Sequence, residues 1–298
     1  MFLIIVLSSF DTSGYEIAKH LATTPDLKNK IQSICAIAED EPQSNDLKDK
    51  GVTISKAKST SDYIGIFEKA DTVVLIPPTK KDKAGHAKNL VDAASKAKVK
   101  NCIVISMAAT DIADQKSHSH LCEFQKIEHL VKQANFEHWL ILRANFYVQN
   151  LLLYQEQIKK GTLPIPSGDG KFAPADLLDV AEATSLLLSN PDKMKEYSGQ
   201  LITMTGPTAM TGQQMAQHIS KVVGKEIKFE DISNEEALKI LSNVKMLDES
   251  EKMLLLEFYD LVKAHRTNFV TAHEFKTMTG RNPSSLDDFI QRHKADLK

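Results

Sequence analysis

Short runs of β-branched and other apolar residues alternate along the first half of the chain with segments whose apolar residues recur every three or four positions. Uninterrupted apolar runs are typical of parallel strands that are buried on both faces, and the intervening periodicity is typical of amphipathic helices. The alternation therefore predicts an α/β fold with a Rossmann-type doubly wound parallel sheet. The expected strands are Phe2–Leu7, Ser33–Ala38, Val52–Ser55, Thr72–Pro77, Cys102–Met107 and Trp139–Arg143.

The second half of the chain has a different pattern. Helical periodicity dominates from about Asn150, interrupted by the Gly- and Pro-rich stretch Gly161–Pro174, which predicts a loop. One further strand, Gln200–Gly206, is expected to return to the sheet. We therefore expect a dinucleotide-binding domain over 1–150, joined by 176–206, and a smaller, mostly helical substrate or partner domain over 151–298. Near the end, Ser284 or Ser285 is expected to cap a helix, with Asp287 or Asp288 three residues on.

Composition limits the classes of partner and compartment. The formal net charge is −2 and no long basic block occurs, so we expect no nucleic-acid binding, and the stretch Lys80–Lys88 is expected to be a solvated loop and helix face. The opening Met1–Phe10 lacks the basic and small-residue flanks of a signal peptide, and no segment is long enough to cross a membrane. Three cysteines without metal-type spacing fit a reducing compartment, so the cytoplasm is the expected location.

Ligands of open parallel sheets bind where the strands end at their carboxyl side. This rule directs attention to five strand ends, and we expect the loops that follow them to converge on one pocket. They are Ser8–Gly14, Glu39–Asp40, Pro77–Thr79, Ser106–Ala109 and Ala144–Tyr147.

Several segments, in order, give the chain a family likeness. The opening strand and helix, followed by "LVDAASKAKVKNCIVIS", "LILRANFYVQNL", "PSGDGKFAPADLLDVAEA", "GQLITMTGPTAMTGQQMAQHIS" and "TMTGRNPSSLDDFIQRH", resemble the NmrA-like proteins of the atypical short-chain dehydrogenase/reductase class. Among these, the pattern is most similar to NAD(P)H:quinone and triphenylmethane reductases. The resemblance implies NAD(P) as cofactor and either reduction of quinones and similar flat electrophiles or sensing of nucleotide redox state without turnover.

The phosphate-binding loop departs from the family's Gly-x-x-Gly-x-x-Gly. Aligning the last glycine with Gly14 places Ser8 and Asp11 at the first two glycines, with Phe10 between them. The Asp11 carboxylate can cap the following helix itself, and it would repel a phosphate by about 4 kcal/mol at ~4 Å in a near-surface dielectric. Two interpretations stay open: a modified cofactor loop that binds weakly, or a capped turn that binds no dinucleotide.

The second strand end bears on which dinucleotide is bound. The family often carries a basic residue there for the 2′-phosphate of NADP, whereas this chain has Glu39. Glu39 can accept a hydrogen bond from a free ribose 2′-hydroxyl, which favours NAD over NADP. The alternative is a solvated acid without a ligand.

The chemistry of the wider class uses Tyr-x-x-x-Lys, and this chain has Cys122-x-x-x-Lys126 in the corresponding place. The resemblance implies that Lys126 holds the ribose, although an exposed helix lysine is the alternative. Tyr147 is the other phenol near the expected nicotinamide, and it either donates a proton or packs on Phe146. Lys126 and Tyr147 are the candidate catalytic residues. The expected cofactor-binding residues are Ser8, Phe10, Asp11, Gly14, Glu39, Pro77, Pro78, Ser106, Met107, Lys126, Asn145 and Phe146.

No metal site is expected. His118, His120 and Cys122 alternate, but the segment that follows is helical, so Cys122 is expected to point elsewhere. The expected partner is a small-molecule substrate. The alternative is a non-catalytic regulatory or scaffold protein that has lost its dinucleotide and binds a protein partner, and the sequence predicts no oligomeric state.

Overall fold

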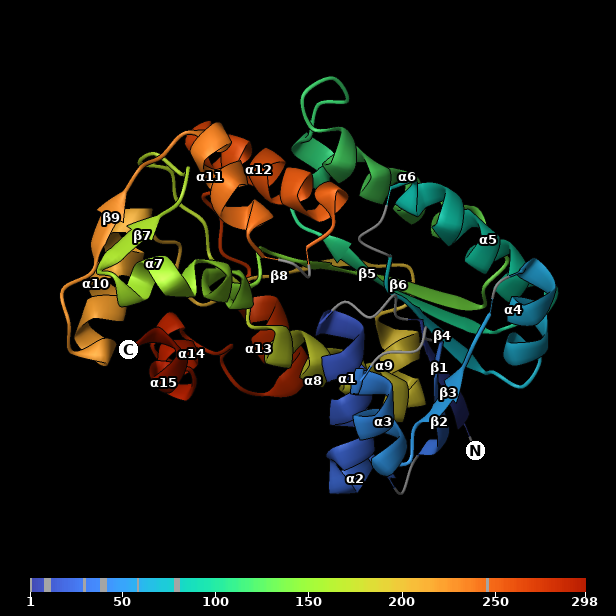
Figure 1. The fold of residues 1–298 in the computed structure, drawn as a ribbon. Helices are drawn as coiled ribbons and strands as arrows, with labels where there is room; N and C mark the ends of the chain where they lie inside the picture. The colour runs from blue at the N-terminus through green and yellow to red at the C-terminus, as the bar shows by residue number, and fades with distance from the viewer. Residues whose placement is uncertain are drawn as a thin grey trace. The chain divides into compact units, whose positions relative to one another are not determined.

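The fold is described from a computed structural model, which covers residues 2–7, 12–28, 31–37, 42–57, 59–77, 81–244 and 247–298. A seven-stranded sheet has the order β3-β2-β1-β4-β5-β6-β8 (Figure 1). β1 pairs in parallel with both β2 and β4, so the strand order reverses between β1 and β4, as in a doubly wound sheet. This confirms the expected fold class. The strands are β1 (Phe2–Leu7), β2 (Ile31–Ile37), β3 (Thr53–Ser55), β4 (Thr72–Leu75), β5 (Asn101–Met107), β6 (His138–Ala144) and β8 (Leu201–Met204).

Each expected strand is present with its ends shifted by two residues or fewer, and β8 confirms that the chain returns to the sheet after the long helical segment. The stretch expected to be a loop contains a short strand, β7 (Thr162–Pro164), which pairs in parallel with β9 (Lys228–Glu230). Strands of this length carry too few residues to show an alternating pattern.

Helices cover both faces of the sheet. Figure 1 shows α4, α5 and α6 on one face and α1, α3 and α9 on the other. The helices are α1 (Thr12–Thr23), α2 (Pro25–Lys28), α3 (Pro42–Asp49), α4 (Thr60–Phe67), α5 (Lys83–Lys96), α6 (Ser119–Gln133), α7 (Gln155–Lys159), α8 (Leu177–Ser189), α9 (Pro191–Glu196), α10 (Gly212–Val223), α11 (Asn234–Ser242), α12 (Glu249–Lys263), α13 (Ala272–Thr279), α14 (Leu286–Arg292) and α15 (Lys294–Leu297). Two 3₁₀ segments cover Thr110–Ile112 and Val148–Tyr154.

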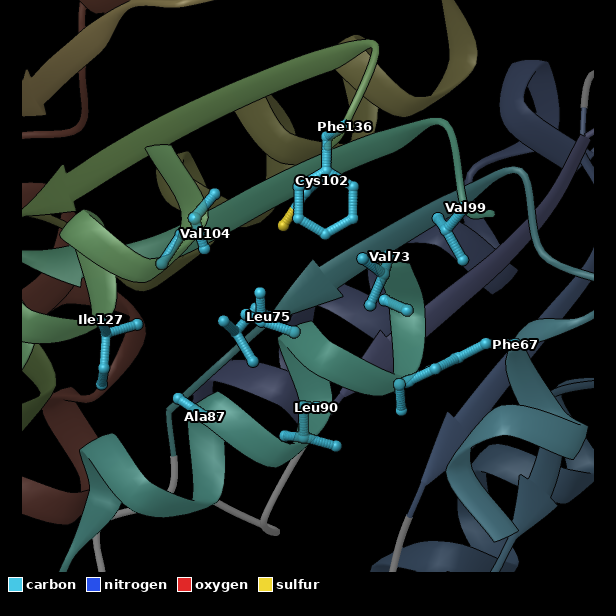
Figure 2. Close-up of a cluster of buried hydrophobic side chains, with 14 of the residues drawn as sticks. Phe67, Val73, Leu75, Ala87, Leu90, Val99, Cys102, Val104, Ile127 and Phe136 are labelled. Atoms are coloured by element: carbon cyan, nitrogen blue, oxygen red, sulfur yellow. The ribbon is translucent and has the colours of Figure 1, made fainter. Parts of the chain in front are cut away.

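The core between the sheet and α4, α5 and α6 follows from helical spacing. On α5, Ala87, Leu90, Val91 and Ala94 recur at i, i+3, i+4 and i+7, and all four are buried. Figure 2 shows Ala87 and Leu90 beside Leu75 of β4 in one apolar cluster. β4 is buried along its whole length, so this core extends to the carboxyl end of the strand.

The chain divides into two compact units. The first comprises Met1–Ser106, Glu123–Arg143 and Val180–Ile202, and the second comprises Met107–Cys122, Ala144–Asp179 and Thr203–Lys298. The division expected from the sequence, 1–150 with 176–206 against 151–298, stays a prediction.

Within the second unit, capping boxes start several helices. Ser285 caps α14, its hydroxyl accepting the Asp288 amide while the Asp288 carboxylate accepts the Ser285 amide. This settles the choice between the two serines. The neighbouring Ser284 donates both its amide and its hydroxyl to Asp179, so this serine attaches the segment before α14 to the start of α8.

Candidate functional site

Three strands of the first unit end in register. Leu7 of β1 is paired with Ile37 of β2 on one side and with Leu75 of β4 on the other. The chain therefore leaves these strands at one edge of the sheet, on both sides of the point where the strand order reverses. Such an edge is where open α/β sheets bind ligands.

Most of the residues predicted for the cofactor loops follow those three in-register positions in the sequence. Ser8, Phe10, Asp11, Glu39 and Pro78 lie outside the described residues.

Two neighbours of these positions lie within the described part. Gly14 is buried in the first turn of α1, and Pro77 is buried two residues after the end of β4. A residue without a side chain in the first turn of a helix leaves room for an anion to approach the N-terminal amides closely.

A buried charged network lies at the carboxyl ends of β5 and β6, also in the first unit. The Arg143 guanidinium donates to both carboxylate oxygens of Glu128, Nε to Oε1 and a terminal nitrogen to Oε2, each at 2.8 Å. The Ser106 hydroxyl donates to Oε1 of Glu128 at 2.7 Å. All three residues are less than a tenth exposed. A fork-to-fork pair of this kind is among the strongest side-chain hydrogen bonds and holds its members in one geometry.

The network decides what Ser106 can do chemically. A hydroxyl has one proton to donate, and here the proton points to Glu128. The Ser106 oxygen can therefore accept a hydrogen bond, but it cannot also donate one to a substrate carbonyl while this contact holds. Ser106 was predicted from its place at a strand end, whereas its partners Glu128 and Arg143 were not.

The segment after β6 belongs to the second unit and is held by its own polar contacts. The Asn145 side chain donates to the Ala173 carbonyl at 2.9 Å and accepts the Phe146 amide at 2.8 Å. Phe146 packs against three aromatic rings of the same unit, those of Phe172, Phe258 and Tyr259. Tyr147 follows half-buried. Asn145 therefore holds this loop by hydrogen bonds and Phe146 holds it by packing, and their contact with a ligand stays a prediction.

The Cys-x-x-x-Lys pair lies on α6 with its two side chains in different surroundings. Cys122 is buried, whereas Lys126 is exposed and lines a groove with Ala84, Gly85 and Lys88 of α5. Met107, at the end of β5, is half-buried. The predicted role of Lys126 in holding a ribose stays a prediction.

Lys83 is buried, although it lies in a stretch that was expected to be solvated. The sequence predicts a solvated helix face over Lys80–Lys88, yet Lys83 at the start of α5 is completely buried. Its ammonium lies 5.1 Å from the centre of the Phe124 ring, and its backbone amide donates to the Glu123 carboxylate at 3.0 Å. The long apolar stem and the ring face allow a cation to be accommodated there.

The alternating histidines serve local structure in the second unit. His118 Nδ1 accepts the Asp114 amide, and His120 Nδ1 lies 2.6 Å from the buried Glu257 carboxylate. The same carboxylate accepts the amides of His120 and Leu121, so Glu257 caps the first turn of α6. In the described ranges, no three His, Cys, Asp or Glu side chains are grouped as metal ligands would be.

Of the two charged partners of Ser106, only Arg143 could have been found from the sequence. An arginine that ends an otherwise apolar strand is buried with it and needs a carboxylate. The carboxylate itself could not be chosen, because α6 carries more than one glutamate and only the helix phase in three dimensions selects Glu128.

No helix among the described residues is both long enough and apolar enough to span a bilayer.

Comparison with known proteins places this geometry in a family. In sequence, the chain is 26% identical over 227 residues to an NAD(P)H azoreductase of Xenophilus azovorans, which covers 76% of each protein. In structure, it is similar to Citrobacter sp. triphenylmethane reductase complexed with NADP(H), with a TM-score of 0.81 and 18% identity over 97% of this chain and 99% of that one.

A second solved structure, the Escherichia coli quinone oxidoreductase QOR2 complexed with NADPH, gives a TM-score of 0.80 and 20% identity over 97% of this chain and 99% of the other. The NmrA-like family model matches residues 10–290, which is nearly the whole chain. The sheet order, the in-register strand ends and these matches agree, and the chain belongs to the NmrA-like family.

Proposed function

We propose that this protein is a nicotinamide-nucleotide-dependent reductase of quinones and similar flat electrophiles, with NADH as the preferred and weakly bound donor. The observation that carries the proposal is that β1, β2 and β4 end in register at Leu7, Ile37 and Leu75. The helix α1 that follows β1 has the buried Gly14 in its first turn. Similar folds in the family hold NADP(H) or NADPH, and related proteins are named for azo, triphenylmethane and quinone reduction.

Gly14, the described residue of the predicted phosphate loop, fits a dinucleotide. Gly14 removes a side chain from the first turn of α1, where a pyrophosphate would be received by backbone amides. A bound reduced nicotinamide supplies the hydride, and the protein then has to orient the acceptor and let a proton reach the reduced product. The Ser106–Glu128–Arg143 network keeps the ends of β5 and β6 fixed beneath the acceptor.

Few protein groups in this arrangement can supply the proton that the reduced product needs. The Ser106 hydroxyl is donated to Glu128, and a buried Cys122 occupies the place of the class tyrosine. We assign proton donation to the half-buried Tyr147 and ribose contact to Lys126, as the sequence predicts. Tyr147→Phe is expected to lower the turnover number without changing the dissociation constant of NADH, because it removes the phenolic hydroxyl and keeps the ring.

The activity is tested by following the loss of reduced-nicotinamide absorbance with 1,4-benzoquinone or an azo dye as acceptor. Binding is measured in parallel from the melting temperature with NADH, NADPH or neither, since ligand at a hundred times its dissociation constant stabilises by ~2.7 kcal/mol. Stabilisation together with acceptor-dependent oxidation supports the proposal. Absence of both contradicts it and favours a scaffold that has lost the dinucleotide.

The preference for a weakly bound NADH rests on Asp11 and Glu39. Asp11→Gly removes a carboxylate from the path of a phosphate and is expected to raise dinucleotide affinity by roughly one to three orders of magnitude, while the lost cap costs only a few tenths of a kcal/mol. Calorimetric titration measures both affinities. Submicromolar binding of NADPH to the unmodified protein would contradict the preference.

A second candidate, binding of the nucleotide without turnover, is favoured by one observation. Ser106 near the end of β5 and Cys122 at the position of the class tyrosine are both unavailable as proton donors, the first by its hydrogen bond and the second by burial. A protein of this kind would be stabilised by NADH and would not consume it with any acceptor. The same two measurements therefore separate a redox sensor from a reductase.

A further inference from the structure

A groove between α5 and α6 lies in the first unit. Figure 1 shows both helices in the layer that covers one face of the sheet. Its volume is about 590 Å³. The lining residues are Ala84, Gly85, Lys88, Gln125, Lys126, His129 and Leu130.

The groove exists because of which side chains the two helices turn toward the core. On α5, Ala87 and Leu90 point to the sheet, which leaves the small Ala84 and Gly85 on the side of the groove. A side chain at position 85 would collide with the Asp82 carboxylate, which accepts the Gly85 amide as the helix cap. The first turn of α5 therefore cannot fill this space, and Leu130 of α6 provides an apolar wall.

The rim of the groove is basic. Lys88, Lys126 and His129 all line it, and no carboxylate is among the described residues of the lining. Lys88 is paired with Asp92 one turn further along α5, at 2.6 Å. Lys126 and His129 are exposed, and within the described ranges neither makes a hydrogen bond or an ion pair. An apolar floor beneath two uncompensated basic groups is complementary to a molecule with an apolar body and one negative charge.

We propose that this groove binds a small amphipathic organic anion, an aliphatic or aromatic carboxylate whose apolar body lies on Ala84, Gly85 and Leu130 and whose head group meets Lys126 and His129. Its volume falls in the range of small-molecule sites. The lining covers only Gln125–Leu130 on α6, about 8 Å of helix at 1.5 Å per residue, which is too short for the i, i+3, i+4 and i+7 anchors of a docked helix. The inference goes beyond the proposed reductase activity but shares Lys126 with it, so the charge variants used in the test leave Lys126 in place.

The test uses decanoate as probe and decanol as the uncharged control of equal length. Amide chemical shifts of the full-length protein are followed by NMR during titration. We expect decanoate to shift the amides of Ala84–Lys88 and Gln125–Leu130 in a saturable way, and decanol to bind there roughly five times more weakly, because an exposed ion pair is worth up to about 1 kcal/mol.

Two exposed positions on α6 give charge variants inside and outside the lining. His129→Glu places a negative charge at the rim and is expected to weaken decanoate binding about fivefold, on the Coulomb energy of two charges ~4 Å apart in water. Lys132→Glu makes a larger change of charge on the same helix, yet its effect is expected to stay below about twofold, because its side chain does not line the groove and water screens it. Ala84→Phe fills the floor and is expected to abolish the shifts. Leu130→Asn, which removes an apolar wall without adding bulk, is the second variant if Ala84→Phe does not fold.

The inference would be overturned if decanoate shifted only amides outside the groove, if decanol bound as tightly as decanoate, or if His129→Glu and Lys132→Glu had equal effects on decanoate binding. A fourth outcome also overturns it: if the groove amides shift with protein concentration in the absence of decanoate, a second copy of the chain covers the groove. Binding of NADH is measured with each variant and reports on the reductase proposal separately.

Discussion

Two buried carboxylates, Glu128 in the first unit and Asp179 in the second, are paired with arginines in different ways. Both carboxylate side chains are 4% exposed. The Arg143 side chain that pairs with Glu128 is 9% exposed, whereas the Arg281 side chain that pairs with Asp179 is 44% exposed. Arg143 lies 15 residues from its partner and Arg281 lies 102 residues from its own.

The difference shows that the burial of the partner decides what a buried carboxylate contributes. If Glu128 is lost, Arg143 keeps a charge that water cannot reach, and that cost is large. If Asp179 is lost, Arg281 can turn into solvent. The first pair therefore fixes the ends of β5 and β6, and the second attaches the distant segment around Ser284 to the start of α8.

The largest effect is expected for Glu128→Leu, which removes from the buried Arg143 the carboxylate that accepts two of its hydrogen bonds. We expect the free energy of unfolding to fall by about 3–5 kcal/mol. Urea denaturation measures it.

The double variant Glu128→Leu/Arg143→Met is the control, since two apolar residues of similar size replace the pair. It is expected to recover most of the loss. If the double variant is as unstable as the single one, the cost comes from packing and the argument from the loss of the Glu128 charge is wrong.

A smaller effect is expected for Asp179→Asn. The amide keeps the size of the side chain, and Arg281 is exposed enough to be hydrated, so the free energy of unfolding is expected to fall by about 1–2 kcal/mol. Limited proteolysis is expected to cut first near Arg281–Ser284, the segment that loses its contacts. Cleavage that starts elsewhere would show that Asp179 does not hold this segment.

The pH dependence of this variant is fixed by the sign of the pKa shift. Burial raises the pKa of Asp179 above its ordinary value and outweighs the opposing effects of Arg281 and of the Ser284 amide. A raised pKa means that ionisation costs the folded state stability. The advantage of the wild type over Asp179→Asn is thus full below pH ~4 and decreases as pH rises through the folded-state pKa. An advantage that grows with pH would contradict this.

The two carboxylates also show which features of the fold can be predicted from the sequence and which cannot. Apolar runs such as Phe2–Leu7 predict their strands because burial on both faces leaves a pattern in consecutive residues. The pairing of Glu128 with Arg143, or of Asp179 with Arg281, leaves no such pattern, because the partners come from different elements. The cap at Ser285 lies between these cases, since its two partners are three residues apart and the pattern left only a choice between two serines.

What the sequence can predict of the candidate site is limited for a physical reason as well. Strand ends can be located from the sequence, so Ser106 and Asn145 were predicted to be near a ligand. What each side chain does depends on its neighbours: Ser106 gives its proton to Glu128, and Asn145 holds the Ala173 carbonyl. Position along the chain does not determine these partners.

A modest effect is expected for Ser106→Ala. The variant removes one hydrogen bond to Glu128 and leaves the bidentate contact with Arg143 in place, so we expect a loss of about 1–2 kcal/mol in the free energy of unfolding. If Ser106 only supports the network, the dissociation constant of a quinone acceptor stays unchanged. A large rise in that constant would show that the serine contacts the substrate.

The smallest effect on stability is expected at an exposed carboxylate, Asp46 of α3. It accepts a hydrogen bond from the Tyr15 hydroxyl of α1 and pairs with Lys50. The hydrogen bond to Asp46 is the main cause that raises the pKa of Tyr15 to about 12, with burial and the nearby negative charge adding to it. Asp46→Asn is expected to leave the urea midpoint nearly unchanged, because exposed pairs contribute little. It is expected to bring the pKa of Tyr15 back toward about 10, measured by NMR titration of the labelled tyrosine ring.

Because the raised pKa favours the protonated phenol, the stability that Tyr15 contributes is complete below pH ~10 and is lost between there and about 12. A Tyr15 pKa that stays near 12 in Asp46→Asn would show that burial, and not the exposed carboxylate, controls this group.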